Sequence, residues 1–578
     1  MLKTVPLHAI LFGVLPVLCG YSSLVSYLLP EELVIPLAVC FALAVIVLLL
    51  SFACLRDWRR AGLVTSALML MNFSFDAMAA PANRLMGGLG LPQDDRFYLV
   101  PFVLLVCFVV YLLLKSKSDY KVSTSFLNML SLVLVVGNAG YIAYHEYKVN
   151  VILSGIYKND DQELAAIHLK KAKNLNDSPD IYYFILDAFG RSDTLKEVYD
   201  FDNSSFINAL KQRGFVIPSG SRSNYQMTCL SLPSSLNMHY LDNLEKILGR
   251  NYTESSDFYR IIQRNRVSSL LKGVGYRYVN VSSGWSPTDY MPCADANIGF
   301  PFGNVFHLAL LRSTLIGPLQ RDFDFLGWAA RRVRLYGLQN IETISSQFQS
   351  QSQSRDQAAA QVSSSSSSSS PKFVFVHVVV PHPPFLFNED GSSCPLSVIS
   401  FSDKFEKEKY VAQVKFLQRQ VLAMLDQLDK SPKKKVVIIQ GDHGPALQNG
   451  SDGNPSPSFL RERMRILNAY RLPDGNPGVT NAGATYAGAA YAVATYPAPI
   501  YADTIYDGIT PVNTFRVVLN RYFDAHLPLL PDKCIYSPNP LPLQFVDVTK
   551  EVTAEVTADL PTANLPTTAT SQVTTSTH

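Results

Sequence analysis

The ten residues VVIIQGDHGP, at positions 436–445, join a short apolar run to a glycine, an aspartate and a histidine. An apolar run without polar alternation is typical of a strand that is covered on both faces. The two glycines that flank Asp442 and His443 permit a tight turn after that strand. We therefore expect Val436–Gln440 to be a buried strand that delivers Asp442 and His443 to one edge of a sheet.

Two other apolar runs lead to polar residues in the same way. Ile181–Leu186 is followed by Asp187, and Phe373–Val380 contains His377 and ends just before His382. Runs of this length and composition also predict buried strands.

The segment between the last two runs predicts an amphipathic helix. Its apolar positions recur at the helical period, with charged residues on the other side. These positions are Val411, Val414, Leu417, Val421, Leu425 and Leu428. A strand, a helix and a strand in this order predict an α/β domain, with a mostly parallel sheet sandwiched by helices.

In such sheets, ligands bind beyond the carboxyl ends of the strands. We therefore expect Asp187, Asp442 and the two histidines His382 and His443 to meet at one edge. Carboxylates and imidazoles are ligands for a divalent metal such as zinc or manganese. Taken singly, each aspartate also suits a turn or helix cap, and each histidine a structural hydrogen bond.

Residues 1–147 have a different composition, since they are apolar with few charges. They contain five runs, near Val5–Leu29, Leu33–Leu55, Ala61–Ala80, Phe97–Leu114 and Thr124–Tyr144. Each run is close to the ~20 residues that a helix needs to cross a bilayer. The sequence therefore predicts an α-helical transmembrane bundle of about five spans before the α/β domain.

Basic residues between the spans predict the orientation. Those on one side are Lys3, Arg56, Arg59, Arg60, Lys115, Lys117 and Lys121. Positive loops stay in the cytoplasm, so the chain beyond Tyr147 should be extracytoplasmic. We expect a multi-pass protein of the plasma (inner) membrane. The net charge of only +3 gives no reason to expect a nucleic-acid partner.

Composition also predicts the boundaries of the remaining parts. We expect a transmembrane domain at 1–147, a linker at 148–177, an α/β domain at 178–348 and 371–548, a serine-rich disordered insertion at 349–370, a flexible insertion at 475–507 and a disordered threonine-rich tail at 549–578.

Four motifs carry a resemblance to a known family. They are ILDAFGR (185–191), SNYQMTCLSL (223–232), PHPPF (381–385) and QGDHGP (440–445). Their order and spacing resemble the sulfatase-like proteins of the alkaline-phosphatase superfamily, which implies an alkaline-phosphatase-like fold. Five spans before such a domain also resemble lipoteichoic-acid synthases and lipid-A phosphoethanolamine transferases.

The resemblance implies roles for the motif residues. Asp187, Asp442 and His443 match the metal ligands of the family, and Thr228 matches its nucleophile, which also touches the metal. A metal-bound threonine hydroxyl loses its proton more easily and becomes a better nucleophile. His382 matches a histidine that contacts phosphoryl oxygens or a second metal. One divalent ion (manganese, zinc or magnesium) is expected, and a second is left open.

Two further residues are weaker candidates for substrate binding. Arg222 lies close to the second motif and suits an anionic substrate, although a surface arginine is the ordinary alternative. His377 lies inside a predicted strand, where core packing is the ordinary alternative.

The chain departs from true sulfatases at two points. Their formylglycine comes from a cysteine or serine followed by Pro-x-Arg, whereas Cys229 is followed by Leu-Ser-Leu-Pro and no arginine. They also usually carry paired aspartates where this chain has Asp187 and Ala188. Both departures argue against sulfate-ester hydrolysis.

The sequence leaves three functions open. The first is a transferase that moves phosphoglycerol or phosphoethanolamine, through a phospho-threonine, from a phospholipid or other phosphoester donor to an envelope glycan or lipid acceptor. The second is an extracytoplasmic phosphodiesterase, phosphatase or sulfuric-ester hydrolase. The third is a non-catalytic membrane scaffold with the same fold.

Overall fold

The structure is a computed structural model. It describes residues 5–91, 94–116, 118–171, 175–299, 304–319, 325–344, 370–394, 406–447, 455–474, 503–539 and 541–554. Its membrane part contains α1 (His8–Ser23), α2 (Val34–Leu55), α3 (Trp58–Gly88), α4 (Arg96–Lys115) and α5 (Lys121–Ala165).

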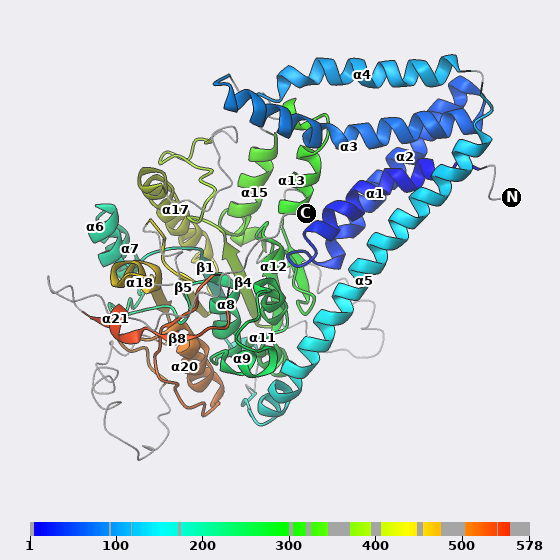
Figure 1. Cartoon of the computed structure of the whole chain (residues 1–578). Coiled ribbons are helices and arrows are strands. Elements are labelled where there is room, and N and C mark those ends of the chain that lie inside the picture. The colour runs from blue at the N-terminus through cyan, green and yellow to red at the C-terminus, as the bar shows by residue number, and fades with distance from the viewer. Residues whose placement is uncertain are drawn as a thin grey trace.

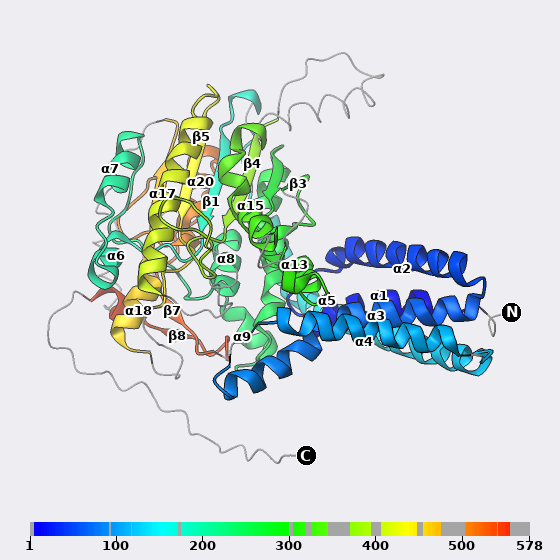
Figure 2. The same ribbon diagram turned by 90° about the horizontal axis from the view of Figure 1, so that it is seen from above.

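Four of these helices are long and apolar enough to cross a membrane. They are α2 with the 3-10 turn before it (Pro30–Leu55), α3, α4 and the part of α5 up to Ile156. The first predicted span forms a shorter helix, because α1 has 16 residues and the chain turns after Ser23. The five helices lie side by side, with α1 among the longer four (Figure 2). The predicted bundle is therefore confirmed, with four helices of full length.

A glycine lets α1 approach α2 closely. A Cβ atom added at Gly13 would lie 2.5 Å from the Cβ atom of Ala44, which is nearer than two carbons can come. Small residues at such contacts are typical of helices that pack within a membrane.

The α/β domain is built on a six-stranded sheet with the order β3-β2-β4-β1-β5-β6. Its strands are β1 (Asp180–Leu186), β2 (Arg277–Val281), β3 (Ala296–Ile298), β4 (Lys372–Val378), β5 (Lys435–Gln440) and β6 (Asn468–Arg471). All neighbouring pairs are parallel except β5 with β6. The mostly parallel sheet predicted from the sequence is confirmed, and the central strands β4, β1 and β5 are those that the apolar runs predicted.

Helices cover both faces of this sheet (Figure 1). Along β1, Tyr182 and Phe184 pack into one apolar cluster, and Tyr183 and Ile185 pack into a second cluster on the other side. The first cluster includes α15 (Phe325–Gln339) and α17 (Lys407–Leu428), and the second includes α8 (Thr228–Asn237), α11 (Arg266–Gly273) and α20 (Pro511–Phe523). Burial on both faces explains why the β1 run has no polar alternation.

The amphipathic helix predicted before β5 is confirmed as α17, and its stripe from Val414 to Leu428 is buried. Most of both predicted insertions, and the tail from 555 onward, lie outside the described residues. Inside the ranges predicted to be flexible, the structure describes the buried Ile505 and Tyr506, and also α21 (Thr549–Thr553), whose Val552 is buried against Cys534 and Tyr536.

The bundle and the α/β domain are joined by more than the chain. Helix α5 runs without a break from the bundle into the residues predicted as a linker. Glu146 of α5 pairs with Arg260 at 2.8 Å, and the carboxylate of Glu32 accepts a hydrogen bond of 3.0 Å from Ser286 Oγ. The α/β domain is therefore held against one end of the bundle (Figure 2).

Candidate functional site

Two aspartates come together where β1 and β5 end. Asp187 directly follows β1, and its backbone N–H donates to the carbonyl oxygen of Val378 at 3.0 Å. Asp442 comes two residues after β5 and accepts a hydrogen bond of 3.1 Å from the N–H of Ala188. Both side chains are buried. The carboxyl ends of the central strands thus carry a pair of buried carboxylates, as the strand positions predicted.

The two loops that carry these aspartates approach each other closely. A Cβ atom at Gly441 would lie 2.6 Å from the carbonyl oxygen of Phe189, so only glycine allows the two loops to approach. Ala188 adopts a left-handed conformation with φ of 63°, which costs about 1 kcal/mol or more for a non-glycine residue. Strain of this kind persists only where the surrounding structure holds it.

Two buried histidines flank the carboxylate pair. Nε2 of His377 lies 3.5 Å from Oδ2 of Asp187. Nε2 of His443 lies 3.6 Å from Oδ1 of Asp187 and 3.4 Å from Oδ2 of Asp442. These separations are too long for strong hydrogen bonds. The four side chains therefore face one another without forming strong hydrogen bonds to one another.

This group fits a divalent metal. The ligand atoms offered by Asp187, His377 and Asp442 lie within 4.8 Å of one another. Oδ1 of Asp187 and Nε2 of His377 are buried without a hydrogen-bond partner among the described residues, which is costly unless another group binds them.

The pKa shifts of Asp442 and His443 also favour a bound metal cation. Burial and the neighbouring carboxylate of Asp187 raise the pKa of Asp442. Burial and the cation of Arg463 lower the pKa of His443, which favours the neutral form of the ring that a metal ligand needs. A cation bound between the carboxylates would remove the repulsion between them.

Thr228, the predicted nucleophile, lies at this group. It is the first residue of α8, and its Oγ1 donates to Oδ2 of Asp442 at 2.7 Å. The same oxygen lies 3.1 Å from Nε2 of His443. The four residues predicted to share a metal, with Thr228 among them, therefore converge although they lie far apart in the sequence.

The other two predicted residues lie differently. The ring of His382 is 6.3 Å from that of His443, between centroids, so His382 stands at the margin of the group. The guanidinium of Arg222 donates to the carbonyl oxygens of Gly220 at 2.9 Å and Asp532 at 3.5 Å. These contacts hold the Arg222 guanidinium against the backbone of Gly220 and Asp532.

Three neighbours of the group were not predicted. Arg463 Nη2 lies 3.2 Å from Nε2 of His443, and Arg463 also donates to the Gly444 carbonyl oxygen at 2.6 Å. Thr288 Oγ1 lies 2.8 Å from Nδ1 of His377. Arg334 of α15 donates to the Val379 carbonyl oxygen at 2.9 Å and adds positive charge near Asp187. None of the three stands in a motif or directly after an apolar run.

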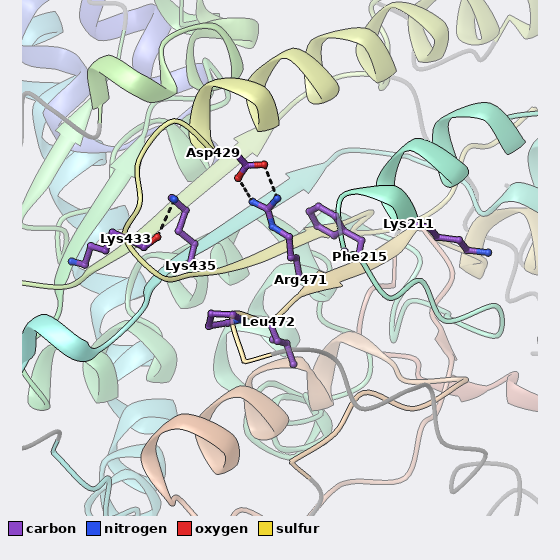
Figure 3. Close-up of a pocket in the computed structure, with 9 residues that line it drawn as sticks. Lys211, Phe215, Asp429, Lys433, Lys435, Arg471 and Leu472 are labelled. Atoms are coloured by element: carbon purple, nitrogen blue, oxygen red, sulfur yellow. Dashed lines mark hydrogen bonds and ion pairs between the residues drawn. The ribbon is translucent and has the colours of Figure 1, made fainter.

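A separate hollow of about 600 Å³ opens at the other end of the strands (Figure 3). It is lined by Lys211, Gly214, Phe215, Asp429, Lys433, Lys435, Arg471, Leu472 and Pro473. Lys435 begins β5, whereas Asp442 follows its end, so this hollow lies at the opposite edge of the sheet from the carboxylate pair. Within it, Arg471 is paired with Asp429 at 2.6 and 2.8 Å.

Some solved structures match the chain at low identity and low TM-score. The C-terminal periplasmic domain of EcEptC from Escherichia coli is 11% identical, with a TM-score of 0.38 over 66% of this chain and 96% of that one. The lipooligosaccharide phosphoethanolamine transferase A (EptA) from Neisseria meningitidis, an integral membrane protein, is 14% identical, with a TM-score of 0.30 over 81% of this chain and 88% of that one. No curated protein matches the sequence.

Family membership rests on a sequence match. The model of the family described as Sulfatase matches residues 179–482, a stretch that runs from the start of β1 past the end of β6 and includes every residue of the buried group. Because this match covers more than half of the 578 residues, the chain belongs to the sulfatase family and is a membrane enzyme of that family.

Proposed function

We propose that the protein is a metal-dependent transferase that moves a phospho-alcohol group, of the phosphoglycerol or phosphoethanolamine type, through a phospho-threonine at Thr228. The observation that carries this proposal is the position of the Thr228 hydroxyl. Its oxygen lies 2.7 Å from a buried carboxylate and 3.1 Å from a buried imidazole, at the edge of the sheet where ligands bind.

The position of Thr228 suits a nucleophile that forms an anionic adduct. As the first residue of the ten-residue helix α8, it lies where unpaired N–H groups and the helix dipole favour negative charge. Its side chain is partly exposed, whereas the next residue, Cys229, is buried. Burial raises the pKa of the Cys229 thiol to about 12, which makes it a poor nucleophile at neutral pH. The threonine is therefore the better candidate of the two.

The residues that would hold the metal are Asp187, Asp442 and His443, together with Thr228 and with His377 on the other side of the carboxylates. When bound, a divalent ion would lower the pKa of the threonine hydroxyl and polarise the phosphoryl oxygens. We propose one ion of zinc, manganese or magnesium.

The reaction divides into two transfers. In the first, Oγ1 of Thr228 forms a bond to phosphorus, its proton passes to the Asp442 carboxylate that accepts its hydrogen bond, and the bond from phosphorus to the leaving oxygen of the donor breaks. That oxygen takes up the proton held by Asp442. In the second, an acceptor hydroxyl attacks the same phosphorus and gives its proton to the Asp442 carboxylate, and Oγ1 leaves and takes up a proton from that carboxyl. His382, at the margin of the group, is positioned to contact the phosphoryl oxygens.

The membrane bundle supports a lipid donor and an envelope glycan or lipid acceptor. The α/β domain lies at one end of the bundle (Figure 2), and the basic loops lie at the other end, where Arg59 Nη1 donates to the Asp119 carbonyl oxygen at 3.3 Å. Because positive loops stay in the cytoplasm, we propose that the α/β domain faces the extracytoplasmic side of the plasma membrane. An enzyme placed there meets phospholipids at the surface of the bilayer.

Three variants test this proposal in a phosphodiesterase assay with a chromogenic substrate. Thr228→Ala should abolish turnover, and Thr228→Ser should retain part of it, since a hydroxyl remains. Cys229→Ala should retain most of it, because the thiol has no role in the reaction. The opposite pattern, loss at Cys229 and full activity in Thr228→Ala, would indicate a formylglycine sulfatase and overturn the proposal. If water replaces the acceptor with no loss of rate, the enzyme is a hydrolase.

A further inference from the structure

Part of the α/β domain packs directly on the membrane helices. The segment after β3 forms α13 (Val305–Arg312) and the 3-10 turn Gly317–Leu319. Phe306 of α13 is buried, and its ring packs edge-on against Tyr21 of α1 at 6.0 Å between centroids. Leu315 packs against the cluster formed by Phe75 and Phe102 of α3 and α4.

The depth of these contacts follows from the helical rise of 1.5 Å per residue. The helices α1 and α3 begin at the end of the bundle that is remote from the α/β domain (Figure 2). Tyr21 comes 13 residues after His8, at about 20 Å, and Phe75 comes 17 residues after Trp58, at about 26 Å. A bilayer has a hydrocarbon layer of about 30 Å. Measured from that end, the contact at Phe75 therefore lies about 4 Å, and the contact at Tyr21 about 10 Å, inside the far boundary of the hydrocarbon layer.

The same segment exposes large apolar side chains beside these contacts. Ile316 is 60% exposed, Leu319 40% and Leu311 36%. Exposed apolar surface costs about 25 cal/mol per Å² in water, and no such cost applies in lipid. Arg312 is exposed next to Leu311. A long cationic side chain beside apolar residues is typical of a membrane interface, where its stem packs on apolar surface and its charge stays among phosphates.

We infer that residues 305–319 are inserted into the leaflet that faces the α/β domain, with Leu311, Ile316 and Leu319 at the acyl boundary. The occupant of this surface is the phospholipid bilayer, because the patch continues the lipid-facing surface of the bundle at the same depth. The inference does not depend on the reaction proposed above. It gives the α/β domain a second attachment to the membrane, in addition to the spans.

Helix α15, which lies next to α13 in Figures 1 and 2, connects the attachment to the candidate site. Trp328 of α15 is 42% exposed and comes six residues, about 9 Å, before Arg334 on the same helix. Arg334 donates to the Val379 carbonyl oxygen at the end of β4, on the edge that carries the carboxylate pair. Tryptophan is enriched at membrane–water interfaces. Insertion of residues 305–319 would therefore bring that edge of the sheet close to the lipid headgroups.

Photo-labelling of the full chain in vesicles tests the inference. The probe is a phosphatidylcholine with a diazirine on its acyl chain, and adducts are mapped by peptide mass spectrometry. We expect adducts on residues 311–319 as well as on the spans. Ile247 is a matched control, since it is 41% exposed but lies far from the bilayer. It belongs to α9 (Asp242–Leu248), which packs against the part of α5 that begins at Val149. Val149 is about 42 Å from the start of α5, so Ile247 should carry no adduct.

Two substitutions, analysed by the same photo-labelling, provide a second test of the inference. Ile316→Asp should abolish adducts on Gly317–Leu319, because a carboxylate withdraws the turn from the acyl region, whereas Ile247→Asp should leave the pattern unchanged. Adducts confined to the spans in the wild-type chain would overturn the inference. A dimer in native mass spectrometry, with residues 311–319 crosslinked between copies and free of lipid adducts, would also overturn it, since a second copy would then cover the patch.

Discussion

Oγ1 of Thr288 lies 2.8 Å from Nδ1 of His377, on the side of the ring that faces away from Asp187. A hydrogen bond from Nδ1–H to this oxygen leaves the lone pair of Nε2 directed at the carboxylate pair. Thr288 belongs to α12 (Ser286–Asp289), whose first residue bonds to Glu32 at the end of the membrane bundle. The orientation of one candidate metal ligand is thus linked, over three residues, to the contact between the bundle and the α/β domain.

Thr288→Val should weaken metal binding by about 10–100-fold, because the loss of a partner that orients a ligand has effects of that size. Thr288→Ser retains the hydroxyl and should bind the metal nearly as tightly as the wild type. Competition titration against a chelating dye measures both affinities. Equal affinities in wild type and Thr288→Val would show that His377 is not a ligand, or that Thr288 does not orient it.

Arg463→Met should change the pH dependence of metal binding. The Arg463 cation contributes to the lowered pKa of His443, so its removal should raise that pKa. Protons compete with the metal for the imidazole, and affinity should therefore begin to fall at a higher pH on acidification than in the wild type. Affinity titrations between pH 5 and 8 would reveal the shift, and Arg463→Lys, which keeps the charge, should follow the wild-type curve. A curve for Arg463→Met that coincides with the wild type contradicts the electrostatic role.

Gly441→Ala should destabilise the α/β domain by about 1–3 kcal/mol, the usual cost of forcing an extra carbon into a packed site. The added Cβ meets the Phe189 carbonyl oxygen at 2.6 Å and displaces the loop that carries Asp442. Gly155→Ala is the control, since no heavy atom of the described residues, apart from the backbone of its own helix, lies within 4 Å of a Cβ at that position. It should be neutral or slightly stabilising. Thermal unfolding in detergent compares the two, and an unchanged Tm in Gly441→Ala would show that the loops are free to separate.

Chelation of the metal should lower the Tm of the wild-type chain, and restored metal should raise it again. A ligand that binds only the folded state at 100 times its Kd stabilises it by about 2.7 kcal/mol. Asp187→Asn removes one of the paired carboxylates and should make the Tm insensitive to both treatments. If neither chelator nor metal changes the Tm of the wild-type chain, the buried group is a structural hydrogen-bond network and not a metal site.

Much of the fold follows from local sequence. The runs at β1, β4 and β5 are apolar on both faces because helices cover both faces, and that pattern is visible without a structure. Asp187, Asp442 and His443 could be placed together because the carboxyl ends of parallel strands meet at one edge. Thr228 comes from a helix start with no such signal, and only the resemblance to a family indicated it.

Other features depend on contacts that the sequence does not display. Thr288 lies in a helix of four residues, and Arg463 is one of three arginines at alternate positions, with Arg461 and Arg465. Their partners, His377 and His443, are 89 and 20 residues away, so spacing does not connect them. The first span was predicted to continue to Leu29, but α1 ends at Ser23. The prediction was too long because hydropathy depends on how apolar the residues are and does not show where the backbone turns.

The central claim, a covalent intermediate on Thr228, is tested most directly by mass analysis. The purified full chain would be incubated with total membrane lipids, quenched in acid and mapped by peptide mass spectrometry, with Thr228→Ala as the control. The account predicts a phospho-alcohol adduct on the peptide that contains Thr228, with a mass that identifies the transferred group, and no adduct in the variant. Turnover of lipid without any adduct on Thr228, or an adduct on Cys229, would contradict it.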